Sequence, residues 1–133
     1  MTEAFADTSF FVAFLSARDV DHAAAVDLME NFEGRIVTTD WVLAELGNFL
    51  ARCSIRNLFA AFVRDLPTDP RMDILPADRE QFDAGCTLYE ARPDKEWSLT
   101  DCISMVVIEQ QSIRDVFTAD HHFEQAGCNI LLK

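Results

Sequence analysis

Short apolar runs alternate along the chain with longer segments in which apolar residues recur every three or four positions. The short runs lie near residues 3–6, 35–38, 72–75, 115–118 and 129–132, and their length is typical of buried β-strands. The segments between them have the spacing of helices. Strands that alternate with helices predict a mainly parallel sheet that is covered on both faces.

Four of the helical segments are well marked. One stripe follows the spacing i, i+3, i+4, i+7 and consists of Ala25, Leu28, Met29 and Phe32. A cleaner stripe over 55–66 follows Ser54, which predicts a helix capped by that serine. A third helix is expected over about 77–91. Residues 102–108 are apolar on almost every side, which predicts a central, buried helix.

Length and composition indicate one compact domain over residues 1–133 with a core rich in its eleven phenylalanines. No apolar run approaches the length that spans a bilayer, and the N-terminus lacks the basic region of a signal peptide. We therefore expect a cytoplasmic protein with no membrane partner. The four cysteines are widely spaced and form no C-x-x-C pair, so buried, reduced thiols are expected.

The formal net charge of −12 argues against broad electrostatic attraction to nucleic acid. The charge is uneven, because residues 1–40 carry eight acids against two arginines, whereas residues 41–75 carry four of each. An acidic protein with local arginines can hold RNA or bind a basic partner. The alternative is that the charge only keeps the domain soluble.

Four acids, Asp7, Glu45, Asp101 and Asp120, lie at the edges of apolar segments. Ligands of parallel α/β folds bind beyond the carboxyl ends of the strands, where Asp7 and Asp120 are expected. Asp101 begins a helix that faces the same edge, and Glu45 lies about one turn into another. Converging carboxylates repel one another, and hard divalent cations relieve that repulsion. The pattern predicts a metal-dependent site that cleaves phosphodiester bonds.

Each acid taken singly has an ordinary structural alternative. Asp7 and Asp120 can serve as helix caps or turn residues. Asp101 completes a capping box with Ser98. Glu45 can be a surface side chain with its carboxylate in water. The metal site therefore depends on the four acids acting together.

Three other kinds of acidic or nucleotide-binding site fit the sequence poorly. A phosphatase of the haloacid-dehalogenase type needs a second aspartate two residues after the first, where this chain has Ser9. A receiver domain needs a late lysine near the acids, and the only lysine in the last third is the terminal Lys133. A Rossmann nucleotide site needs clustered glycines, and the four glycines are scattered.

The order and spacing of several motifs resemble those of the PIN-domain nuclease family, and especially of its small VapC-type toxins. The motifs are ADTSFFVAFL, TTDWVLAELGNFL, SLTDCISMVVIEQQSIRDVFTADHHFEQAG and the final strand. The resemblance covers nearly the whole chain. It implies an α/β fold, a three-layer α/β/α sandwich with a mainly parallel central sheet.

The resemblance also implies an endoribonuclease that uses Mg²⁺ or Mn²⁺, is held in check by an antitoxin and forms a homodimer. The acids of the family correspond to Asp7, Glu45, Asp101 and Asp120, which would act in catalysis and hold the metal. The hydroxyl groups that follow the first acid and precede the third correspond to Thr8 or Ser9 and to Thr100. Asp7 and Asp101 are expected as direct ligands, whereas Asp120 and Glu45 bind through water or position the nucleophile.

The remaining candidates are a basic residue and the histidines. Arg52 lies seven residues after Glu45, and on a continued helix it would contact the RNA backbone or pair with a pocket acid. His121 and His122 stand where some family members have a further acid, which puts a second metal in question. A cap or surface role is expected for His22, His121 and His122.

Two functional alternatives to a toxin stay open. One is a housekeeping RNA-processing nuclease that has no antitoxin, and the other is a non-catalytic PIN-like module that binds a partner.

Overall fold

The structure, a computed structural model, describes residues 2–132. The strands are β1 (Glu3–Ala6), β2 (Arg35–Thr39), β3 (Met72–Leu75), β4 (Asp115–Phe117) and β5 (Asn129–Ile130). The helices are α1 (Thr8–Leu15), α2 (His22–Asn31), α3 (Asp40–Leu50), α4 (Leu58–Asp65), α5 (Arg79–Ala91), α6 (Leu99–Gln110) and α7 (His121–Gln125), with a short 3₁₀ helix, η1 (Leu66–Thr68).

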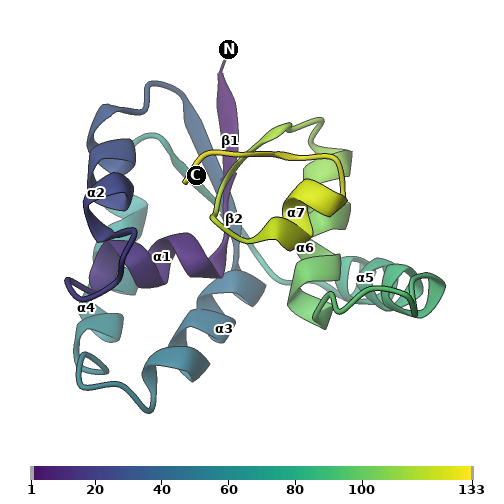
Figure 1. Ribbon diagram of the computed structural model, residues 1–133, viewed down its shortest axis with the longest axis horizontal. Coiled ribbons are helices and arrows are strands. Elements are labelled where there is room, and N and C mark those ends of the chain that lie inside the picture. Colours follow the sequence, from purple (N-terminus) through teal and green to yellow (C-terminus); the bar gives the residue numbers. More distant parts are fainter. Residues whose placement is uncertain (1, 133) are drawn as a thin grey trace.

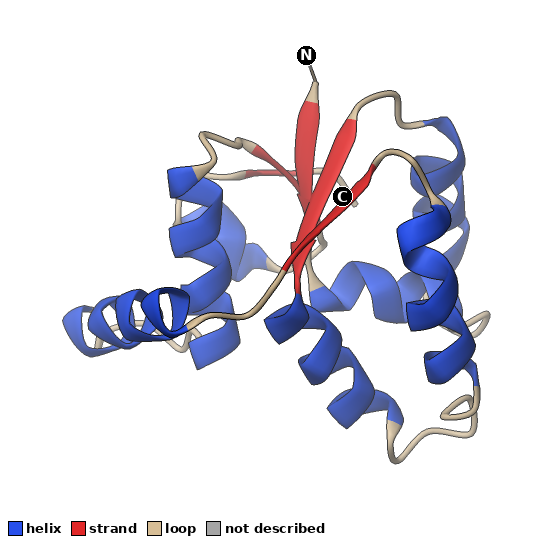
Figure 2. Ribbon diagram, turned by 180° about the vertical axis from the view of Figure 1, so that it is seen from behind, coloured by secondary structure: helices blue, strands red, loops and turns tan. Residues whose placement is uncertain are grey.

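The five strands form one sheet in the order β3-β2-β1-β4-β5, and every described pairing is parallel. Helices α1, α2 and α4 lie on one side of the sheet, and α5, α6 and α7 lie on the other (Figures 1 and 2). Each crossover between parallel strands needs such a helical connection. The predicted α/β/α sandwich with a parallel central sheet is confirmed.

The first strand lies at the centre of the sheet, where the strand order changes direction. Phe5 of β1 pairs with Val37 of β2 on one side and with Val116 of β4 on the other. The connections that follow β1 and β4 therefore diverge and leave a crevice beyond the carboxyl ends of these two strands. Open α/β sheets bind their ligands at such a switch point.

The core between sheet and helices is rich in phenylalanine, as the composition predicts. The largest fully buried rings belong to Phe5, Phe10, Phe11, Phe117 and Phe123. Phe117 packs against Phe10 with ring centroids 4.9 Å apart. Burying one such side chain stabilises the fold by roughly 1.5–3 kcal/mol, so these rings hold β1, β4 and α1 together firmly.

The predicted buried helix is α6, in which seven residues including Asp101 and Ser104 are buried. The helix expected over 77–91 is α5, which begins after a capping box formed by Asp78 and Gln81. The final strand is shorter than its apolar run, because β5 pairs with β4 only at Asn129 and Ile130.

The prediction of a helix over 55–66 capped by Ser54 is wrong at its start. Consecutive turns occupy residues 51–57, with backbone hydrogen bonds from Cys53 to Leu50 and from Arg56 to Cys53. These turns reverse the chain between α3 and α4, and α4 begins only at Leu58. Periodicity alone could not show this, because Ile55 packs against the core from a turn as well as it would from a helix.

The cysteines are all free, but only Cys102 is buried. Cys53, Cys86 and Cys128 are half-buried, so the expectation of four buried thiols is wrong for these three. Lys133 lies outside the described residues. Within residues 2–132, none of the helices has both the length and the apolarity needed to cross a membrane.

Candidate active site

The four predicted acids line one pocket, of about 570 Å³, at the carboxyl edge of the sheet. Figure 1 shows α1 and α3 starting beneath the lower ends of β1 and β2, where this edge lies. The lining residues are Asp7, Thr8, Ser9, Val12, Asp19, Glu45, Asn48, Phe49, Asp101 and Asp120. The convergence that sequence spacing predicts is therefore present, with Asp19 as a fifth acid.

Three of the four acids also cap helices, so the same carboxylate serves both as a helix cap and as a pocket acid. Asp7 and Asp120 occupy the N-cap positions of α1 and α7, where Asp120 accepts a 2.9 Å hydrogen bond from the His122 amide. Asp101 forms a reciprocal capping box with Ser98. Each cap bond orients its carboxylate at the point where the helix begins. The local structure thus places the three charges side by side.

Asp7 is the most deeply buried of these acids, with 3% of its surface exposed. Its Oδ2 accepts hydrogen bonds of 3.1 Å from Ser9 Oγ and from Thr118 Oγ1. Burial, reinforced by the charge of Asp101, raises the pKa of Asp7 to about 7 against the opposing effect of these bonds. Repulsion between acids is thus a physical property of the metal-free pocket.

Asp101 and Asp120 are bridged by His122. The Nδ1 atom of His122 lies 3.2 Å from Asp101 Oδ2 and 3.4 Å from Asp120 Oδ1. Burial is the main cause that raises the pKa of Asp101, and the charge of Asp120 acts in the same direction, whereas the Ser98 amide and His122 oppose it. The expected surface or cap role is therefore wrong for His122, which sits among the acids.

The other two histidines do fit that expectation. His22 Nδ1 lies 2.8 Å from the Ala13 carbonyl oxygen and ties the start of α2 to α1. His121 is exposed, and its Nδ1 is 3.8 Å from Asp120 Oδ1. Neither ring reaches the other pocket acids through a described contact.

Glu45 is held by the hydroxyl that follows the first acid. Thr8 Oγ1 donates a 2.5 Å hydrogen bond to Glu45 Oε1. The half-buried Glu45 is therefore fixed at the pocket and is not a free surface side chain. Thr8 and Ser9 consequently have separate tasks, because Thr8 orients Glu45 and Ser9 orients Asp7.

Two predicted residues are not brought to the pocket. Thr100 precedes Asp101 in the first turn of α6 but does not line the cavity. Arg52 does not share a helix with Glu45, because α3 ends at Leu50. The Arg52 side chain is exposed in the turn that follows and forms no ion pair with any residue of the described chain.

Sequence reasoning missed two polar residues of the site. Thr118 is fully buried, donates to Asp7 and accepts a 3.0 Å hydrogen bond from the Asp120 amide. Thr118 could have been predicted from the sequence, because it lies two residues before Asp120 at the end of an apolar strand. Asp19 lies in the loop between α1 and α2, where no periodic pattern marks its approach to the pocket.

The chemistry of the pocket fits a hard divalent cation. Five carboxylates line it, and no lysine or arginine among residues 2–132 does. Carboxylate oxygens are the ligands that Mg²⁺ and Mn²⁺ prefer. Burial, and after it the charge of Asp101, raises the pKa of Asp7, and a bound cation would offset both effects. The side chains of Asp120, His121 and His122 also lie close enough together to share an ion.

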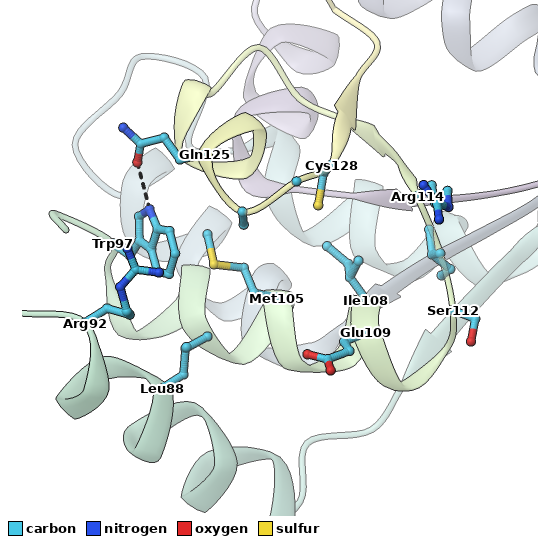
Figure 3. Close-up of a pocket in the computed structure, with 13 residues that line it drawn as sticks. Leu88, Arg92, Trp97, Met105, Ile108, Glu109, Ser112, Arg114, Gln125 and Cys128 are labelled. Atoms are coloured by element: carbon cyan, nitrogen blue, oxygen red, sulfur yellow. Dashed lines mark hydrogen bonds between the residues drawn. The ribbon is translucent and has the colours of Figure 1, made fainter. Parts of the chain in front are cut away.

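A second cavity, of about 620 Å³, lies between α5, α6 and α7 (Figure 3). Residues 112–114 and 125–128 line it just before β4 and β5 begin, so it is at the opposite edge of the sheet. Trp97 Nε1 donates to Gln125 Oε1 at 3.0 Å across its wall. It contains a single acid, Glu109, and no group of converging carboxylates, so it does not supply the predicted chemistry.

Known proteins share the sequence pattern and the fold of this chain. The sequence pattern of the PIN domain matches residues 4–127. The 23S rRNA-specific endonuclease VapC20 of Mycobacterium tuberculosis (strain CDC 1551 / Oshkosh) is 30% identical over 124 residues, which cover 92% of this chain and 93% of VapC20.

Solved structures show the same fold. The crystal structure of Mycobacterium tuberculosis VapC20, a toxin that cleaves the sarcin-ricin loop, superposes with a TM-score of 0.86 at 21% identity, covering 95% of this chain and 96% of that one. FitAcB from Neisseria gonorrhoeae gives 0.69 at 18% identity, with 96% of both chains covered. VapBC2 from Rickettsia felis, bound to a DNA fragment of its promoter, gives 0.66 at 12% identity, with 97% of both chains covered. Over nearly its whole length, this chain belongs to the PIN domain family.

Proposed function

We propose that the chain is a divalent-metal-dependent endoribonuclease that hydrolyses phosphodiester bonds of RNA in the cytoplasm and serves as the toxin of a toxin–antitoxin pair. The observation that carries this proposal is the convergence of Asp7, Glu45, Asp101 and Asp120 on one pocket. The 23S rRNA-specific endonuclease activity named for VapC20 supports RNA as the substrate class.

Asp7 and Asp101 would hold the metal, Mg²⁺ or Mn²⁺, because they are the buried acids whose pKa values the pocket raises. Asp120 and Glu45 would bind it directly or through water. When bound, such an ion orients a water molecule, lowers its pKa and stabilises charge on the phosphoryl oxygens.

The surrounding side chains keep the carboxylates in place for this chemistry. Ser9 and Thr118 hold Asp7, and the hydroxyls of these two residues are themselves 2.7 Å apart. Thr8 holds Glu45, and His122 bridges Asp101 and Asp120. A fixed arrangement of ligands lowers the cost of organising the site when the ion and the phosphate arrive.

A protein inhibitor follows from the toxin role, and the solved relatives include complexes named VapBC and FitAB. We propose that an antitoxin inserts an arginine or lysine among the pocket acids, where it would pair with Asp7 or Asp101 and displace the metal. The net charge of −12 would speed the approach of a basic tail and make it sensitive to salt. A homodimer is proposed on the family resemblance.

One observation favours a second candidate, a non-catalytic module. Three of the four acids cap helices, so they would have a structural reason to be present without catalysis. Glu45 argues against this candidate, since it lies within α3, caps no helix and still lines the pocket.

The toxin role is tested by expressing the chain in a bacterium with and without the gene next to it. Growth arrest that requires Asp7 and is relieved by the neighbouring gene is the expected result. Normal growth in all cases, from a protein that cleaves RNA in vitro, would point to a housekeeping nuclease. Normal growth together with absent cleavage would point to the non-catalytic module.

A further inference from the structure

Phe49 exposes a large apolar ring at the rim of the acidic pocket. It lies in the last turn of α3, four residues after Glu45, and both side chains line the same cavity. With 53% of its surface exposed, it differs from the buried phenylalanines of the core. Its ring also pairs with no other aromatic ring in the described part of the chain.

The pocket itself offers nothing cationic to attract RNA. Its lining residues include five acids and no basic side chain, in a protein whose net charge is −12. A metal ion compensates charge only at the phosphate that it contacts. Affinity for the rest of a polyanionic strand must come from other contacts, and stacking of a base on an aromatic ring does not depend on charge.

A further hollow, separate from the cavity between α5, α6 and α7, adjoins the acidic pocket along α3 toward α4. It has a volume of about 750 Å³, and Asn48 lines both this hollow and the acidic pocket. Arg56 lines this further hollow from the turn after α3, and its Nη1 donates a 3.1 Å hydrogen bond to the Ala51 carbonyl oxygen. Arg56 is exposed and forms no ion pair with any residue between 2 and 132. Figure 1 shows this turn beside α4, beyond the end of α3.

The path from the acids past Asn48 and Phe49 to Arg56 therefore carries, in order, a cluster of carboxylates, an exposed aromatic ring and a cation that forms no ion pair among residues 2–132. We propose that Phe49 stacks on an unpaired base next to the scissile phosphate and that Arg56 binds a phosphate further along the same strand. Such stacking requires a base that is unpaired at this position, because a base within a duplex does not expose its face to a side chain. This inference rests on the proposed ribonuclease function.

The test is steady-state cleavage of a labelled, mixed-sequence single-stranded RNA in magnesium by four proteins: the wild type, Phe49→Ala, Phe49→Trp and Tyr89→Ala. Stacking on one base is worth roughly 1–3 kcal/mol, so Phe49→Ala should raise KM by about 5-fold to 150-fold, with a smaller effect on kcat. Phe49→Trp should keep KM within about 3-fold of wild type, since indole stacks as well. Tyr89→Ala is the matched control, because Tyr89 is similarly exposed, at 56%, on α5 away from the acidic pocket.

Arg56 is tested by the dependence of RNA binding on salt. Arg56→Gln should weaken binding of the same single-stranded probe and lower the slope of log affinity against log salt by about one. An unchanged slope would remove Arg56 from the proposed path.

The outcomes separate this inference from the function on which it rests. If the wild type cleaves RNA and Phe49→Ala has the wild-type KM, the stacking role is overturned and the nuclease stands. If Phe49→Ala keeps its KM but no longer binds the product of the neighbouring gene, Phe49 contacts a protein and not RNA. If the wild type does not cleave, the nuclease function fails first, and the inference fails with it.

Discussion

Thr8 Oγ1 donates a 2.5 Å hydrogen bond to Glu45 Oε1 and so connects the first turn of α1 to the middle of α3. Of the four predicted acids, Glu45 is the one that caps no helix, and this bond fixes it. It also explains why a hydroxyl follows Asp7 directly, since the start of α1 brings that residue to the pocket together with Asp7.

The Thr8 hydroxyl should matter for activity through Glu45. Thr8→Val keeps the shape of the side chain and removes the donor, whereas Thr8→Ser keeps the donor. A hydrogen bond to a charged group contributes about 1.5–3 kcal/mol, so Thr8→Val should lose roughly 10-fold to 100-fold in the cleavage rate, and Thr8→Ser should stay near wild type. Equal rates for all three proteins would show that Glu45 needs no such support.

Asp101 should be more valuable for catalysis than for stability. Asp101→Asn removes a charge that burial disfavours and that Asp120 repels, and it keeps an oxygen that can accept from the Ser98 amide. In EDTA its melting temperature should therefore equal or exceed that of wild type, while RNA cleavage is lost. Asp101→Ala, which also loses the cap bond, should be less stable than Asp101→Asn by roughly 0.5–2 kcal/mol. A clearly lower midpoint for Asp101→Asn would mean that the negative charge at the helix end outweighs the repulsion.

The metal-free protein should lose stability as the pH rises from about 4 to about 7. Folding raises the pKa of Asp7 from 3.8 to about 7, so the folded state binds more protons than the unfolded state in this window. The loss is complete above pH 7 and amounts to at most about 4 kcal/mol. Denaturant unfolding in EDTA across this pH range measures the loss in the free energy of unfolding. The difference between wild type and Asp7→Asn isolates the Asp7 contribution, and a difference that does not change with pH would contradict it.

The contact between α5 and α6 should tolerate no side chain at Gly85. A Cβ atom there would lie 2.3 Å from Ile103 Cγ1 and 3.2 Å from the Ile103 backbone. Relief of this overlap needs a shift of packed helices, so Gly85→Ala should lower the free energy of unfolding by about 1–3 kcal/mol even though alanine is the better helix former. Gly127→Ala is not a matched control, because Gly127 has a φ of +91°. Ala84→Ser, at the half-buried position next to it in the same helix, is the matched control and should change the free energy of unfolding much less.

Much of the fold could be predicted because each strand coincides with an apolar run and the buried helix α6 is apolar on almost every side. The acids could be predicted because Asp7 and Asp120 follow the strands at which the sheet changes direction. The prediction of a PIN-type sandwich is confirmed, and the prediction of a VapC-type ribonuclease agrees with the activity named for VapC20. The ligand set and the choice of metal stay predictions.

The sequence-based predictions that were wrong or incomplete have a common physical cause. Apolar spacing does not distinguish a helix from successive turns that bury the same residues, and this is why α4 begins after Ile55 and Arg52 leaves the expected helix face. Asp19 was missed for a similar reason, because it lies in a loop whose conformation no periodic pattern predicts. The roles of Asp101 as a cap and as a pocket acid looked like alternatives in the sequence, whereas the cap is what positions the acid.

Cleavage of RNA with and without a divalent ion tests the central claim most directly. Purified protein, stripped with EDTA, should not cleave a single-stranded RNA. Magnesium or manganese should restore cleavage to wild type but not to Asp7→Asn, whose folding is checked by circular dichroism. Undiminished cleavage in EDTA, or a fully active Asp7→Asn protein, would contradict a site in which converging carboxylates hold a catalytic metal.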